Sequence, residues 1–166
     1  MKCICLSILF VFTTWSANAV TRSWTNSAGG NWFISANWSP NGVPSGTDVA
    51  NITNNGTYTV TIATGTVAVV SYNVGGASGT QTLALQTADS VTAAGTVRAN
   101  GILDMSSGSL LGSLVILPGG QLVFNTPGNK FLDTLNLINQ GTVTWNAGQL
   151  LNGGQPATVV SNGGQW

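Results

Sequence analysis

The feature that most constrains the fold is a repeat of just over twenty residues in the second half of the chain. Residues 113–124 (SLVILPGGQLVF) align with residues 134–145 (TLNLINQGTVTW) at an offset of 21, and residues 160–166 continue the series at an offset of 23. The matched pairs are Leu114 with Leu135, Ile116 with Leu137, Gly120 with Gly141, Leu122 with Val143, Phe124 with Trp145, and Asn139 with Asn162. A period of this length with several strands per period is typical of a β-solenoid, in which successive coils pair and like residues stack.

The rest of the chain reads as short strands separated by turns. Residues 57–62 (TYTVTI) alternate apolar and polar side chains, which predicts a strand buried on one face. Further short strands are predicted at 66–70, 82–85, 90–92, 96–98, 102–104, 113–117, 121–124, 134–138, 142–145 and 157–160. Steps such as Gly-Gly, Pro-Gly and Asn-Gly lie between them and favour turns. Residues 57–166 leave room for about five coils.

The first nineteen residues have the three parts of a signal peptide. Met1 and Lys2 give a positive start, residues 3–12 (CICLSILFVF) are almost wholly apolar, and Ala17-Asn18-Ala19 fits the small-x-small cleavage pattern. The apolar run is shorter than the roughly 20 residues that span a bilayer. We therefore expect cleavage after Ala19, a secreted or cell-surface protein, and no membrane span in the mature chain. Both cysteines, Cys3 and Cys5, lie in the segment that is removed.

The small number of charged residues excludes several functions. They make up 5% of the chain, against about 25% in typical soluble domains. The full set is Lys2, Arg22, Arg98 and Lys130 against Asp48, Asp89, Asp104 and Asp133, with no Glu and no His. Four scattered cations cannot form a nucleic-acid surface, and a chain without His lacks the usual catalytic triads and imidazole metal sites. We expect no cofactor and no metal.

The segment from residue 20 to residue 56 differs in composition from the coils predicted after it. Trp24, Trp32 and Trp38 occur there among glycines and prolines. One interpretation is a cap, because the end of a solenoid exposes an apolar cross-section that large aromatic residues can cover. The other is a platform on which the three rings contact glycans. The predicted organisation is thus a signal peptide at 1–19, a Trp-rich capping region at 20–56 and β-solenoid coils at 57–166.

These motifs carry a resemblance to a known group of proteins. The pattern W-x(7)-W-x(5)-W-S-P, followed by G-V-P-x(3)-D-x-A-x-I and the TYTVTI strand, resembles the amino-terminal portion of large secreted bacterial β-helix proteins with autotransporter-associated β-strand repeats or PEP-CTERM-type sorting signals. The resemblance implies a right-handed parallel β-helix that is exported, in a group largely of unknown function whose members are often assigned surface or adhesive roles. It supplies no catalytic residues, and the chain departs from the pattern in showing neither a carboxy-terminal barrel nor a sorting helix.

The acidic residues suggest little chemistry. Asp48 lies in a turn, where capping by its carboxylate explains it better than metal binding. Asp89 and Asp133 are 44 residues apart, about two coils, which would suit an inverting glycosidase only if they were in register. Arg98 with Asp104 is too sparse for a polysaccharide lyase. We predict no catalytic site.

The sequence thus predicts an all-β chain that is an exported, non-enzymatic structural or adhesive module of a larger repeat protein. The alternative is a carbohydrate-binding module or a β-helix polysaccharide-degrading enzyme. The expected partners are surface glycans or other copies of the chain. Because Trp166 falls where the preceding coil still has two strand residues to come, we also expect the sequence to be truncated.

Overall fold

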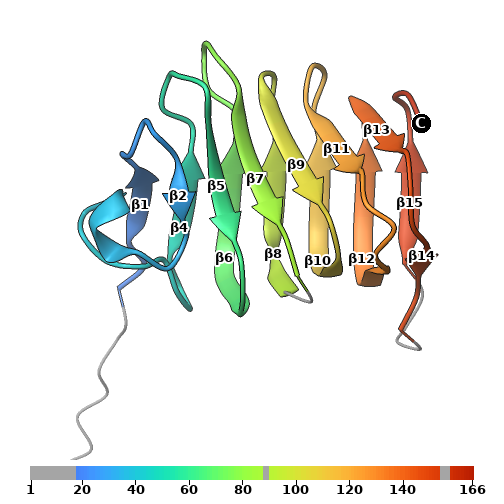
Figure 1. The fold of residues 1–166 in the computed structure, drawn as a ribbon, viewed down its shortest axis with the longest axis horizontal. Helices are drawn as coiled ribbons and strands as arrows, with labels where there is room; N and C mark the ends of the chain where they lie inside the picture. Colours follow the sequence, from blue (N-terminus) through green and yellow to red (C-terminus); the bar gives the residue numbers. More distant parts are fainter. Residues whose placement is uncertain (1–17, 88–89, 154–157) are drawn as a thin grey trace, which may run out of the picture.

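The chain coils into a stack of parallel β-strands, shown in Figure 1 with the amino-terminal coil at the left and the carboxy-terminal coil at the right. The structure is a computed structural model that describes residues 18–87, 90–153 and 158–166. From β4 to β14, successive strands alternate between two sheets, so each of these coils contributes to both. The expected all-β fold, a β-solenoid of about five turns, is confirmed.

The two sheets are built from strands of different length. The larger sheet contains, in spatial order, β3 (Trp38–Ser39), β1 (Thr21–Trp24), β4 (Val49–Ile52), β6 (Thr66–Val74), β8 (Ser90–Val97), β10 (Gly108–Ile116), β12 (Lys130–Asn139) and β14 (Leu150–Leu151), with β15 (Val159–Asn162) also on β12. The smaller sheet contains β2 (Gly30–Asn31), β5 (Tyr58–Ile62), β7 (Gln81–Leu85), β9 (Gly101–Met105), β11 (Gln121–Phe124) and β13 (Thr142–Trp145). A short 3-10 helix, η1, spans Ser35–Asn37. Among the described strands only β1 and β3 pair antiparallel.

The core consists of columns of side chains that run through the stack. In the larger sheet one column passes from Ile52 through Val74 and Val97 to Ile116, and all four side chains are fully buried. In the smaller sheet Val60, Leu83 and Leu103 form an equivalent buried column. Each such side chain contributes roughly 1.5–3 kcal/mol of transfer free energy. Inward and outward side chains alternate along each strand, as in β5, whose first, third and fifth residues are buried and whose two threonines are not.

The register agrees with the sequence repeat in one sheet and differs in the other. Gln121–Phe124 pairs with Thr142–Trp145 at the predicted offset of 21. In the larger sheet, however, Leu114 pairs with Leu137, an offset of 23, so the predicted match of Leu114 with Leu135 is wrong.

One local feature raises the offset within the larger sheet from 22 to 23, and another returns it to 21 in the smaller sheet. A bulge opposite Leu110 and Gly112 gives β12 one extra residue, where Thr134 has a φ of +52°. The turn after β12 (residues 140–141) is then two residues shorter than the turn after β10 (residues 117–120), which restores the offset of 21 in the next sheet.

A second column of the larger sheet alternates large and small side chains. Tyr72 lies beside Gly95, and Gly95 lies beside Leu114. A Cβ atom on Gly95 would stand 2.4 Å from both Cζ and the hydroxyl oxygen of Tyr72 and 2.9 Å from a methyl carbon of Leu114. The aromatic ring therefore occupies the space that a side chain at position 95 would need.

We expect Gly95→Ala to lower the free energy of unfolding by roughly 1–3 kcal/mol, because the methyl group overpacks the core. Urea denaturation monitored by circular dichroism would measure it. Gly163→Ala is the matched control, since its nearest contact is at 3.8 Å, and should be close to neutral. Adding Tyr72→Leu to Gly95→Ala should recover part of the loss; full additivity of the two changes would contradict the packing described here.

Candidate functional site

The three tryptophans form a cluster at the amino-terminal end of the stack. Trp24, Trp32 and Trp38 are 0%, 1% and 2% exposed. Trp38 meets the other two edge to face, with ring centroids 5.1 Å from Trp24 and 4.8 Å from Trp32. The indole of Trp38 donates to the carbonyl of Trp32 at 2.8 Å. The expected Trp-rich cap is present, and in this arrangement the rings offer no free face to a sugar.

The cap is continuous with the coils. β1 pairs in parallel with β4, and β2 pairs in parallel with β5. Parallel stacking therefore begins at Thr21, within the segment that the sequence assigned to capping. The cap is one coil whose open side is closed by the Trp cluster and by the antiparallel strand β3.

Asp48 ties strand β1 to the turn before β4 within this cap. Its carboxylate accepts hydrogen bonds from the Nε of Arg22 at 3.0 Å and from the backbone N–H groups of Val20 and Ser45 at 3.1 and 3.2 Å. Burial alone would raise the pKa of Asp48, but Arg22 and the backbone donors outweigh it and hold the pKa below its ordinary value of 3.8. Asp48 has the capping role that its turn position predicted.

Lys130 is a buried cation that no pattern in the sequence indicated. Its side chain is fully buried, and its Nζ donates to the carbonyls of Gly128 at 2.8 Å and Ala147 at 3.2 Å, and also to that of Thr126. Burial lowers the pKa of Lys130, and the negative charge of Asp104 partly opposes the shift. The ammonium group thereby ties the turn at residues 125–129 to the turn of the next coil.

The remaining acidic residues form no constellation in the described part of the chain. Burial raises the pKa of Asp104, which has one buried carboxylate oxygen without a hydrogen-bond partner. Asp133 accepts a hydrogen bond from the backbone N–H of Gly153 at 2.5 Å. Asp89 lies outside the described residues, so its register with Asp133 is not tested. Within residues 18–87, 90–153 and 158–166, no three acidic, Cys or His side chains are grouped as a metal site would require.

The carboxy-terminal end of the stack is open, unlike the capped end. Trp145 and Trp166 are 52% and 53% exposed, and they line a groove with Thr142, Val143, Thr144 and Gln165. Val160 belongs to the inward column above Leu137 yet is 45% exposed. Every residue of β15 is exposed.

An asparagine ladder also reaches this open end. Asn139 is fully buried and continues the column of Ile116. Its Nδ2 donates to the Oδ1 of Asn162 and to the carbonyl of Gln165, both at 2.7 Å. Its Oδ1 accepts from the backbone N–H of Gly141 at 3.1 Å. The buried amide is thus satisfied by the last coil, as a polar side chain in a core must be.

A polar groove on the outer side of the larger sheet was not foreseen from the sequence. Asn51, Thr53, Asn73 and Arg98 line it together with Gly75, Gly76, Ala77 and Ala99. The spacing of 22 residues between Asn51 and Asn73 is one coil and was the available signal.

Comparisons with known proteins return nothing similar: no protein family, no curated protein and no solved structure matches the chain. The class is therefore established by the fold alone, and it is a β-solenoid with a Trp-rich cap. Among the described residues, no helix is long and apolar enough to cross a membrane. The segment expected to be a signal peptide lies almost wholly outside the described residues.

The bonds of Asp48 predict how cap stability depends on pH. Because its pKa is lowered by folding, its contribution is present above pH 3.8 and is lost as pH falls through the folded-state pKa. Asp48→Asn should abolish this part of the acid destabilisation, measured by urea denaturation between pH 2 and 6.

Asp104→Asn gives the opposite control. Burial raises the pKa of Asp104, so its ionisation costs stability as pH rises through 3.8 to the folded-state pKa. In Asp104→Asn, the free energy of unfolding should therefore decrease less than in the wild type as pH rises above 3.8. If both variants changed the pH profile in the same direction, the assignment of the two carboxylates would be wrong.

Proposed function

We propose that the chain is an exported, non-enzymatic module of a larger cell-surface or secreted repeat assembly, with a structural or adhesive role. The observation that carries the proposal is the difference between its two ends. One end is closed by buried tryptophans, whereas the other exposes Trp145, Val160 and Trp166 around an edge strand. Proteins ordinarily protect such edges, because unpaired strands template further pairing.

The occupant of this edge that suits it best is another parallel coil. β15 extends the pairing of β12 at the open end, and Val160 and Asn162 continue the inward columns above Leu137 and Asn139. A coil paired with β15 would bury the side chain of Val160. Its residue in register with Asn162 could form a hydrogen bond with the amide of Asn162. In the absence of such a coil, a second copy of the chain offers the same chemistry.

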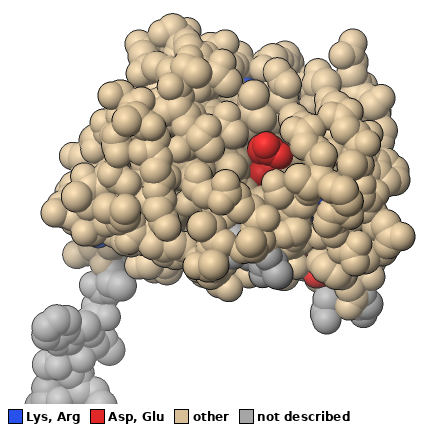
Figure 2. Space-filling view, in the orientation of Figure 1, with Lys and Arg blue, Asp and Glu red and all other residues tan. Residues whose placement is uncertain are grey.

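The surface supports a structural role over catalysis. Figure 2 shows one face of the stack as almost wholly uncharged. With four acidic and four basic residues in 166, charge repulsion does little to keep open β-edges apart. Columns of aliphatic residues and backbone hydrogen bonds suffice to hold such a module together outside a cell without disulfides.

The test of this role is the state of association of residues 20–166. We expect the wild-type chain to associate end to end, as measured by light scattering, and the size to change little with salt. Val160→Lys places a charge at the open edge and should yield monomers. Val70→Lys is the matched control, since Val70 is 56% exposed on β6, away from both ends, and should leave association intact. A monomeric wild-type chain, or equal dispersal by both lysines, would contradict the proposal.

The family resemblance of the amino-terminal motifs belongs with this proposal. The W-x(7)-W-x(5)-W-S-P pattern and the TYTVTI strand support a kinship with secreted bacterial autotransporter-type or PEP-CTERM-type β-helix proteins. The β-solenoid is consistent with that kinship.

Export makes a separate prediction. Expression of the full chain in a bacterium should release a mature protein that begins at Val20, as read by mass spectrometry of the amino-terminal peptide. Ala19→Leu should block cleavage, because signal peptidase accepts small residues at this position. Retention of Met1 on the wild-type protein in the cytoplasm would contradict export.

A further inference from the structure

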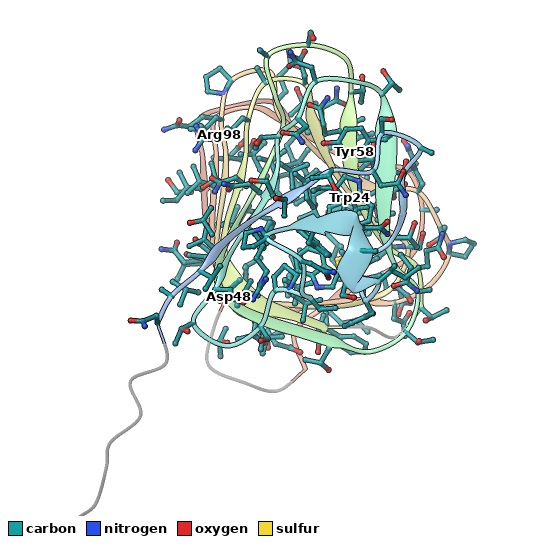
Figure 3. The ribbon with its side chains drawn as sticks, turned by 90° about the vertical axis from the view of Figure 1, so that its left-hand side faces the viewer. Trp24, Asp48, Tyr58 and Arg98 are labelled. Carbon is teal, nitrogen blue, oxygen red and sulfur yellow. The ribbon has the colours of Figure 1, made fainter. Side chains whose placement is uncertain are left out.

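The groove on the outer side of the larger sheet is formed where three successive coils leave that sheet. Asn51 of β4 pairs in register with Asn73 of β6, and Arg98 directly follows β8. The groove that these residues line with Thr53 has a volume of about 540 Å³. Figure 3 shows Arg98 at the periphery of the stack, away from Asp48 and the buried Trp24.

The polar side chains of this groove are ordered by one another. The Nη2 of Arg98 donates to the Oδ1 of Asn73 at 3.0 Å, and the Nδ2 of Asn73 donates to the Oδ1 of Asn51 at 2.9 Å. The corner beside them is closely packed, because a Cβ atom on Gly76 would stand 2.2 Å from the carbonyl oxygen of Thr53. The groove is thus a fixed shape with a guanidinium group at one end of an amide ladder.

Arg98 is the one exposed cation without an acidic partner in residues 18–87, 90–153 and 158–166. Arg22 is paired with Asp48, and Lys130 is fully buried. The single bond from Arg98 to Asn73 uses one of five N–H donors, so the guanidinium keeps most of its capacity to bind an anion.

From this geometry we propose that the groove binds an acidic polysaccharide. The guanidinium group of Arg98 pairs with a carboxylate or sulfate on one sugar, and Asn51, Asn73 and Thr53 hydrogen-bond hydroxyl groups of the neighbouring sugars. Guanidinium matches such planar or tetrahedral anions with paired N–H groups. Adjacent coils are about 4.8 Å apart, which is close to the length of one sugar ring in an extended polymer. The ladder can therefore follow successive sugars along the stack.

This inference names a partner for the adhesive part of the proposed function and rests on it. The two are separable in the laboratory, because the groove and the open carboxy-terminal edge share no residues. The Val160→Lys variant, which is expected to be monomeric, should bind the polysaccharide as the wild type does. Binding without association would overturn the assembly proposal alone, and association without binding would overturn the groove proposal alone.

The test is calorimetric titration of the full chain with three oligosaccharide probes at low salt. We expect binding of an oligogalacturonate, which carries carboxylates, or of a sulfated dextran oligomer, and none of neutral dextran. Comparison of the affinities for the two charged probes shows whether the groove prefers carboxylate or sulfate. Equal binding of neutral dextran, or no binding of either charged probe, would overturn the proposal.

Variants locate the binding. Arg98→Gln should weaken it about tenfold or more, since a charge-assisted hydrogen bond is lost. Asn73→Ala keeps the charge but removes the partner that orients Arg98, and should weaken binding less. The matched control combines Arg98→Gln with Thr92→Arg, which restores the net charge on an exposed residue at the other end of β8. If this double variant bound as the wild type does, the attraction would be unspecific and the groove would not be the site. Circular dichroism of each variant confirms that the fold is intact.

Discussion

Parallel pairing of each coil with the next is the constraint on which the rest of the structure depends. It places every inward side chain directly against its counterpart one coil away, as in the column Ile52, Val74, Val97 and Ile116. A charge at such a position would meet apolar neighbours above and below and would cost several kcal/mol unless it were paired. This geometry explains why the inward positions are almost free of charge. Lys130 is a buried charge, but its ammonium group is satisfied by hydrogen bonds to three backbone carbonyls.

The local strand pattern was largely predictable from the sequence. β11 and β13 begin and end at the predicted residues, because a Gly-containing turn precedes each and their side chains alternate clearly. The predicted strands at 90–92 and 96–98 are instead one strand, β8, because pairing with β6 and β10 holds the residues between them in extended conformation. The register of the larger sheet was not predictable, since β12 pairs with β10 at an offset of 22 before the bulge at Thr134 and of 23 after it.

The functional features were less accessible to sequence reasoning. The cap was recognisable because three tryptophans lie among glycines and prolines just before the repeating strands. The groove at Arg98 was hidden, because its polar side chains come from three coils and are separated by 22 and 25 residues. The cage of Lys130 was hidden for a different reason, since it is made of backbone carbonyls, which every residue carries.

The buried asparagine ladder has a consequence for how the stack can grow. A column of aliphatic side chains does not strongly favour one register, because a methyl group packs about equally well against several others. The amide of Asn139 does favour one register, since the side chain that completes its hydrogen bonds, that of Asn162, lies in register with it. A coil added one step out of alignment would enclose an unmatched polar group. The Asn139–Asn162 pair therefore favours one register of the last two coils.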